Sequence, residues 1–179
     1  MILAPGDIVA VRGRGWLADG IIKAEYGDGM PPYNAVSHVG LLVAGDPIPV
    51  VIEALNQVVT DPLDVTLAGC ARAFVLHDKS LNENQRRAII AKACTFSAKS
   101  YGYLDLFAQW LDANTGTTWW TDRMSGYLGH WPICSFVVAE AYSAVGLDFG
   151  VDNASCKPSD IMEFATKHPE IYDVTAIKR

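Results

Sequence analysis

Two apolar runs, at residues 36–44 and 50–54, constrain the fold of this chain more than any other feature. The segment between them begins with Gly45-Asp46-Pro47, which favours a reversal of the backbone. β-Branched runs bounded by such residues are typical of paired strands. The sequence therefore predicts a tight antiparallel hairpin.

Two ionisable side chains occur within these apolar runs, His38 in the first run and Glu53 in the second. If Gly45 and Asp46 form a two-residue turn, counting outward places His38 directly opposite Glu53 on one face, about 4.5–5.5 Å apart between Cβ atoms. A buried carboxylate is costly without a partner. A longer turn would change this register and could move Glu53 to the other face.

The remaining apolar patterns predict further strands and helices. Strands are expected at 7–12, 72–77 and 171–176, and helices at 16–26, from a capping box Ser80-x-x-Glu83 to about 99, at 134–145, and from Pro158 to about 167. Strand and helix patterns alternate without repeats or low-complexity tracts. We predict one α+β domain spanning residues 1–179, with an antiparallel sheet packed against helices.

The composition argues against several classes of partner. With 14 Lys and Arg against 20 Asp and Glu, and no basic run, the formal net charge is −6, which does not suit nucleic acid. The N-terminal residues do not form a signal peptide, and no apolar stretch is long enough to span a bilayer. We expect a soluble protein, cytoplasmic by default, unless another apparatus delivers it to a cell wall or a virion.

Cys134 is the clearest candidate nucleophile. It begins the apolar run CSFVVAEAY at 134–142, and a thiol in the first turn of a helix has a lowered pKa because of the helix dipole. His38 would act as its base, and Glu53 would fix the tautomer of His38. The structural alternative is a small buried cysteine, a core histidine and a Glu paired with an Arg.

The other cysteines and histidines give weaker signals. Cys70, Cys94 and Cys156 are expected to be reduced, buried thiols, although two disulfides remain open, and no spacing of the four cysteines indicates a metal site. We expect surface or structural roles for the remaining histidines, which are His77, His130 and His168.

Six segments together resemble a known family. They are PGDIV at 5–9, SHVGL at 37–41, VIEA at 51–54, YGY at 101–103, CSFVVAEAY at 134–142 with a following Gly146, and KPSDI at 157–161. In this order they resemble the circularly permuted NlpC-type, papain-like cysteine hydrolases, in particular the YiiX/YebB-like branch. Each segment alone is weak, but together they cover nearly the whole chain.

The resemblance implies a permuted papain-like core in which the catalytic His precedes the Cys. It assigns Cys134 as nucleophile, His38 as base and Glu53 as the third residue, without metal or organic cofactor. It also suggests an oxyanion donor beyond the backbone N–H of Cys134, with Tyr103 as a candidate for that role or for lining the cleft.

An aromatic segment at 104–131 is the expected substrate-binding region. We single out Trp119, Trp120 and Trp131, which could line a groove for sugar rings or acyl chains; the alternative is ordinary packing. The segment is longer than the usual family connection, so it could serve as a lid.

The sequence leaves the substrate open. The leading hypothesis is a cysteine peptidase or amidase that cleaves bacterial cell-wall peptide. The alternatives are a hydrolase or acyltransferase of lipid acyl esters or amides, suggested by likeness to lecithin:retinol acyltransferase, and a catalytically silent binding or virion module. The oligomeric state is not readable from the sequence.

Overall fold

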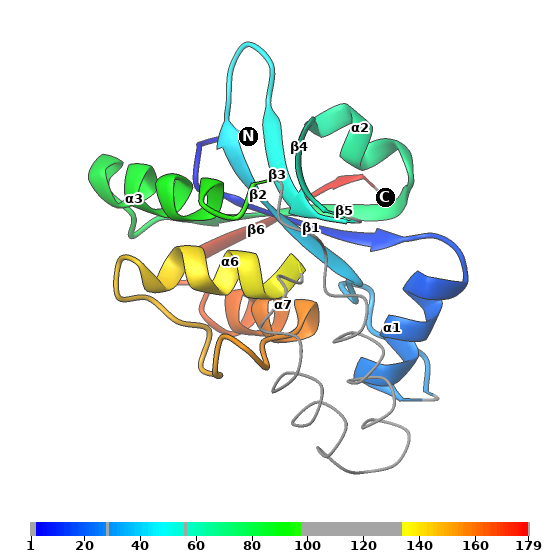
Figure 1. The fold of residues 1–179 in the computed structure, drawn as a ribbon. Helices are drawn as coiled ribbons and strands as arrows, with labels where there is room; N and C mark the ends of the chain where they lie inside the picture. Colours follow the sequence, from blue (N-terminus) through cyan, green and yellow to red (C-terminus); the bar gives the residue numbers. More distant parts are fainter. Residues whose placement is uncertain (1–2, 28, 56, 98–133, 179) are drawn as a thin grey trace, which may run out of the picture.

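The computed structural model describes residues 3–27, 29–55, 57–97 and 134–178. These residues form one antiparallel sheet with helices on both faces (Figure 1), so the α+β prediction is confirmed. The six strands lie in the order β4-β3-β2-β1-β5-β6. Their bounds are β1 Ile8–Gly13, β2 His38–Ala44, β3 Val50–Ala54, β4 Val58–Pro62, β5 Cys70–Asp78 and β6 Tyr172–Lys178.

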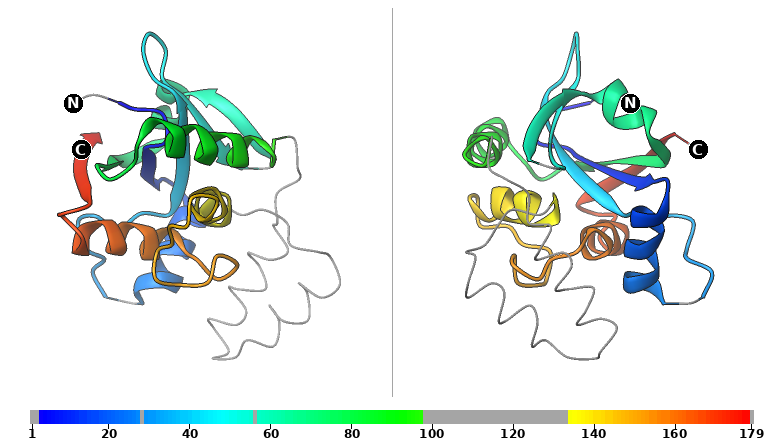
Figure 2. Two further views of the ribbon diagram at one scale, coloured as in Figure 1. Left: turned by 90° about the vertical axis from the view of Figure 1, so that its left-hand side faces the viewer. Right: turned by 45° about the vertical axis from the view of Figure 1, so that its right-hand side comes forward.

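Three helices cover one face of the sheet, as two further views show (Figure 2). They are α3 (Glu83–Cys94), α6 (Cys134–Ser143) and α7 (Pro158–Lys167), and α6 lies between the other two. Alternate residues of each strand pack against these helices, such as Ile8 and Ala10 of β1. The next residues along β1, Val9 and Val11, face the other side, which is covered by α2 (Leu63–Ala68).

The central helix α6 is fastened to the sheet by polar contacts as well as by its apolar residues. The Tyr142 hydroxyl, fully buried, donates a hydrogen bond to the carbonyl of Gly6 at 2.9 Å, just before β1. Glu140 of the same helix pairs with Lys92 of α3 at 3.2 Å. These contacts fix the position of the helix that begins with Cys134.

Several predicted elements are observed with small changes. Helix α1 spans Trp16–Tyr26 as predicted, and α7 begins with Pro158 at its first turn. The predicted strand at 72–77 extends to Cys70–Asp78, the last strand is Tyr172–Lys178, and the helix from residue 134 ends at Ser143.

The predicted N-cap of α3 was wrong by two residues. Asn82 caps the helix, and its capping-box partner is Gln85, with both hydrogen bonds at 3.0 Å. Ser80 instead bonds through its N–H and its hydroxyl to Asp78 Oδ1, which turns the chain out of β5. The helix ends at Cys94 rather than near residue 99.

The predicted register of the β2–β3 hairpin was also wrong. Ala44 pairs with Val50 rather than with Pro47, because the loop is five residues long, 45–49, and includes a cis Asp46–Pro47 bond. A register irregularity between Leu42 and Ala44 then brings Gly40 opposite Glu53. The displacement from the predicted pairing is two residues, so His38 and Glu53 keep the same face of the sheet.

Candidate active site

Cys134 begins α6 and points to the start of β2. Its side chain is hydrogen-bonded to His38, and the backbone N–H of Val39 donates to its sulfur. Cys134 is 6% exposed, so the sulfur lies at a largely enclosed position. The first turn of a helix also carries N–H groups without intrahelical partners and the positive end of the helix dipole.

His38 lies between the sulfur and a buried carboxylate. Its Nε2 is 2.7 Å from Glu53 Oε2, which leaves Nδ1 as the ring nitrogen that faces Cys134. The His38 side chain is 16% exposed, whereas that of Glu53 is 4% exposed. His38 therefore lies between the side chains of Cys134 and Glu53, and a catalytic role for the three stays a prediction.

Gly40 explains how the His38–Glu53 contact forms across a diagonal of the hairpin. Glu53 lies opposite Gly40, two residues from His38. A Cβ atom on Gly40 would lie 2.6 Å from Val51 Cγ1 and 3.2 Å from Glu53 Cβ. Because Gly40 has no side chain, the Glu53 side chain can cross this position, and diagonal pairs are within reach of long side chains.

The three groups influence one another's ionisation. Burial disfavours a charged His38, but the negative charges of Cys134 and Glu53 and their hydrogen bonds outweigh it and raise the pKa of His38 to about 10. Burial likewise opposes ionisation of Cys134, yet the charge and hydrogen bond of His38 lower the pKa of the thiol. This arrangement favours a thiolate–imidazolium pair.

The chain supplies two further polar groups that the sequence did not indicate. Thr66 of α2 donates its hydroxyl to Glu53 Oε1 at 2.8 Å. Glu25 of α1 accepts from the backbone N–H of Ser159 at 3.2 Å, and its charge opposes ionisation of Cys134. Burial raises the pKa of Glu25 to about 7. The sequence does not indicate Thr66, because a helix of six residues is too short to show a clear period. It does not indicate Glu25, because the contact of Glu25 with α7 exists only in the folded structure.

The other cysteines differ from Cys134. All four are free thiols, and Cys94 is exposed rather than buried, which corrects the expectation for that residue. Burial raises the pKa of Cys156 to about 12 and also raises that of Cys70. Among these shifted thiols only Cys134 has its pKa lowered.

Ser135 is adjacent to the candidate nucleophile but has a structural contact. Its buried hydroxyl donates to the carbonyl of Cys156, in the segment before α7. His77 pairs with the buried Asp7 at 2.8 Å, and His168, at the end of α7, contacts Glu170 at 2.9 Å. The expected structural roles of His77 and His168 agree with these contacts.

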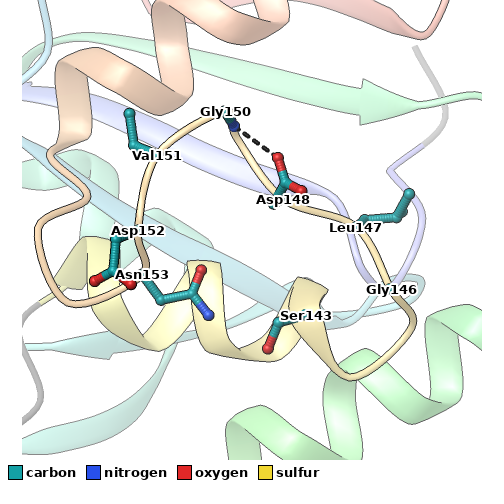
Figure 3. A pocket seen from close by; sticks show the side chains of 8 residues that line it. All are labelled: Ser143, Gly146, Leu147, Asp148, Gly150, Val151, Asp152 and Asn153. Carbon is teal, nitrogen blue, oxygen red and sulfur yellow. Dashed lines mark hydrogen bonds between the residues drawn. The ribbon is translucent and has the colours of Figure 1, made fainter.

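The four aromatic residues proposed to bind substrate lie outside the described residues. They are Tyr103, Trp119, Trp120 and Trp131, and His130 lies outside as well. An open pocket is formed by the loop after α6, between Ser143 and Asn153 (Figure 3). It lies at the opposite end of α6 from Cys134, and its Asp148 is engaged by the N–H of Gly150 at 2.8 Å. We assign it no part in the site.

No protein-family model matches the chain, and no curated protein matches it. Among solved structures, the fold is similar to that of metalloprotein yiiX from Escherichia coli O157:H7, with a TM-score of 0.59. The two chains are 22% identical, and the match covers 82% of this chain and 69% of that chain. No helix among the described residues has the length and apolar character needed to cross a membrane. The likeness establishes a YiiX-like α+β fold for this chain.

Proposed function

We propose that the protein is a cysteine hydrolase that cleaves an amide bond through a thioacyl-enzyme. The observation that carries this proposal is the unbroken set of contacts from Cys134 through His38 to Glu53, joined to a lowered pKa of the thiol and a raised pKa of the imidazole. A structural His–Glu pair would not need a buried thiol hydrogen-bonded to the second ring nitrogen.

In the first half-reaction, the Cys134 thiolate attacks the substrate carbonyl carbon, and a C–S bond forms. The negative charge moves to the carbonyl oxygen, near which the backbone N–H of Cys134 is the first candidate donor. The imidazolium of His38 then gives its proton to the leaving amine as the C–N bond breaks. Cys134 is left as a thioester with a neutral His38.

In the second half-reaction, water replaces the amine. His38 takes a proton from the water as its oxygen attacks the thioester carbonyl, and the C–S bond breaks to release the carboxylic acid and the thiolate. Glu53 accepts the Nε2–H bond throughout, so Nδ1 remains available to exchange the proton. The cycle restores the thiolate–imidazolium pair.

We further propose that the fold is a permuted papain-like core of the YiiX/YebB-like branch. Support comes from the order of the parts, because His38 and Glu53 lie on β2 and β3 whereas Cys134 begins a helix late in the chain. The likeness to yiiX supports the same branch.

The similar protein yiiX is described as a metalloprotein, which raises the question whether His38 and its neighbours could bind a metal ion. In the described part of the chain, no group of three or more His, Cys, Asp or Glu side chains is arranged to hold a metal ion. Both ring nitrogens of His38 are already engaged, by Glu53 and Cys134. His38, Cys134 and Glu53, with the described residues around them, do not fit a metal centre, and we derive no step through one.

Cell-wall peptide is the leading substrate proposal, and lipid acyl esters or amides are the alternative carried by the resemblance. The test incubates wild-type protein and Cys134→Ala with muropeptides and acyl lipids in parallel, and follows product by mass spectrometry. We expect turnover of muropeptides by the wild type only, and a mass increase equal to the acyl group on Cys134 under quenched conditions. Turnover of acyl lipids alone would reverse the substrate order, and equal activity of both proteins would refute the nucleophile.

A further inference from the structure

We propose that Thr66 is a positioning residue for the catalytic groups, holding Glu53 in the orientation that His38 requires. The inference rests on the proposed function and extends the triad to a fourth side chain. Thr66 Oγ1 donates to Glu53 Oε1 at 2.8 Å, while Oε2 of the same carboxylate contacts His38 Nε2 at 2.7 Å. Each carboxylate oxygen therefore has one side-chain partner.

The short helix α2 is fixed at both ends, which holds Thr66 in place. At its start, Leu63 is buried and its N–H donates to the carbonyl of Pro49 at 2.8 Å. At its end, the carbonyl of Leu67 accepts bonds from Lys178 Nζ at 2.6 Å and from Cys70 Sγ at 3.2 Å. The helix is thus held by the loop before β3, by β5 and by β6, so the Thr66 hydroxyl does not depend on one contact for its position.

The direction of the Thr66 hydroxyl is informative. In helices a threonine hydroxyl commonly returns to a carbonyl of the preceding turn. Here it leaves the helix and donates to a carboxylate that is 4% exposed. A buried carboxylate oxygen without a donor carries a large desolvation cost, so this bond favours the ionised, correctly oriented form of Glu53.

Ionised Glu53 in turn stabilises the imidazolium of His38. Burial raises the pKa of Glu53, but the hydrogen bond and charge of His38, together with the hydroxyl of Thr66, bring it below the usual value. Without the Thr66 hydroxyl, rotation or protonation of the Glu53 carboxylate becomes more favourable. His38 would then hold its proton less strongly, and the Cys134 thiolate would lose its counter-charge.

The experiment compares Thr66→Val, which keeps the shape but lacks the hydroxyl, with Thr66→Ser, which retains it. Thr60→Val is the matched control, because Thr60 is an exposed threonine on the neighbouring strand β4. The readout is the rate of alkylation of Cys134 by iodoacetamide from pH 5 to 10, with each site identified by peptide mass spectrometry. Urea unfolding of each variant reports stability separately.

We expect Thr66→Val to lower the rate at the wild-type plateau by roughly tenfold and to move its half-maximum to higher pH, consistent with losing one hydrogen bond to a charged group. Thr66→Ser should restore most of the rate, and Thr60→Val should equal the wild type. In a Glu53→Gln background, Thr66→Val should add little, because both changes act through one carboxylate. Thr66→Ala, which suits a helix, replaces Thr66→Val if the latter does not fold.

The outcomes separate this inference from the proposed function. If wild-type Cys134 reacts preferentially but Thr66→Val reacts equally fast, the positioning role is refuted and the hydrolase proposal stands. A loss of stability without a change in rate or pH profile would also refute it, because Thr66 would then only tie α2 to the sheet. If wild-type Cys134 reacts no faster than Cys94, the proposed function itself fails.

Discussion

Gly40 shows how much the site depends on one missing side chain. Its Cβ position is occupied by Val51 Cγ1 at 2.6 Å and approached by the carbonyl of Ile52 at 3.1 Å. Glu53 lies directly opposite Gly40, with its Cβ 3.2 Å from the same position, and its carboxylate contacts His38 two residues away on β2. A substitution there acts on stability and on the site together.

We expect Gly40→Ala to destabilise the protein by about 1–3 kcal/mol, because the added methyl overpacks the hairpin. It should also slow Cys134 alkylation by displacing Glu53. The control is Gly20→Ala in α1, where a Cβ meets nothing within 4 Å and should stabilise the helix by about 0.5–1 kcal/mol. Urea denaturation measures both changes, and equal stability of Gly40→Ala and wild type would contradict the steric argument.

The pH dependence of Cys134 reactivity follows from the two displaced pKa values. Since the pKa of the thiol is lowered, its alkylation rate should reach half-maximum below pH 8.5, the ordinary value for cysteine. A second change is expected near pH 10, where His38 loses its proton. Iodoacetamide kinetics measure both steps, with the exposed Cys94 as the reference thiol on the same chain.

Removal of the imidazole tests whether His38 is the cause of the lowered pKa of Cys134. In His38→Gln the imidazolium is gone and burial still opposes ionisation, so the half-maximum for Cys134 should rise to pH 8.5 or above. An unchanged profile would mean that the helix dipole alone activates the thiol.

Residue types predicted the candidate triad better than the details of its geometry. A His and a Glu within apolar strands, and a Cys at a helix start, were visible in the sequence. A register displaced by two residues still left His38 and Glu53 on one face of the hairpin. The five-residue loop was not visible, because Gly45-Asp46-Pro47 also suits a two-residue turn. Thr66 could not be found, since only the folded hairpin brings it to Glu53.

At the scale of elements, α3 is tied to β1 by a polar cluster in which His77 and Arg86 surround the buried Asp7. Asp7 is fully buried, and its Oδ1 contacts Arg86 at 3.0 Å and His77 at 2.8 Å, while Oδ2 accepts from the N–H of Ala4. Arg86 also donates to the carbonyls of Pro5 and Asp78. The cluster joins the chain before β1, the end of β5 and α3.

We expect Asp7→Asn to lower the free energy of unfolding by about 3–5 kcal/mol, because it leaves the guanidinium of Arg86 without its buried counter-charge. Glu83→Gln is the control on the same helix. It breaks only the exposed pair with Arg87 and should change stability by less than about 0.5 kcal/mol. Chemical denaturation of both variants checks this, and a similar small effect for Asp7→Asn would show that the cluster is not a structural tie.

Long elements with a clear period were predictable, and short ones were not. Helix α1 and the start of α7 agree with the prediction because periodicity and Pro158 define them locally. The prediction omitted β4 and α2, since five strand residues ending in Pro62 and a six-residue helix carry little periodic signal. The pairing of β4 with β3 and the hydrogen bond from Lys178 of β6 to α2 are tertiary contacts.

For the molecule as a whole, the four thiols differ in their exposure to solvent and can be used to probe its packing. Cys94 is exposed, Cys134 lies at the site, and Cys70 and Cys156 are buried on opposite faces of the sheet. We expect native protein to react at Cys94 and Cys134, whereas Cys70 and Cys156 should react only at the rate of unfolding. Mass spectrometry of peptides after timed alkylation, with and without urea, measures this. Rapid native labelling of Cys156 would contradict the packing described here.

The hairpin carrying His38 and Glu53 is local in sequence, whereas Cys134 reaches it from much farther along the polymer. During synthesis His38 and Glu53 therefore leave the ribosome well before Cys134 does. Until α6 docks, the sulfhydryl has no imidazolium beside it and retains ordinary, sluggish reactivity. Only the assembled tertiary structure therefore lowers the pKa of this thiol, and a nascent or partly unfolded chain should resist premature alkylation and oxidation at Cys134.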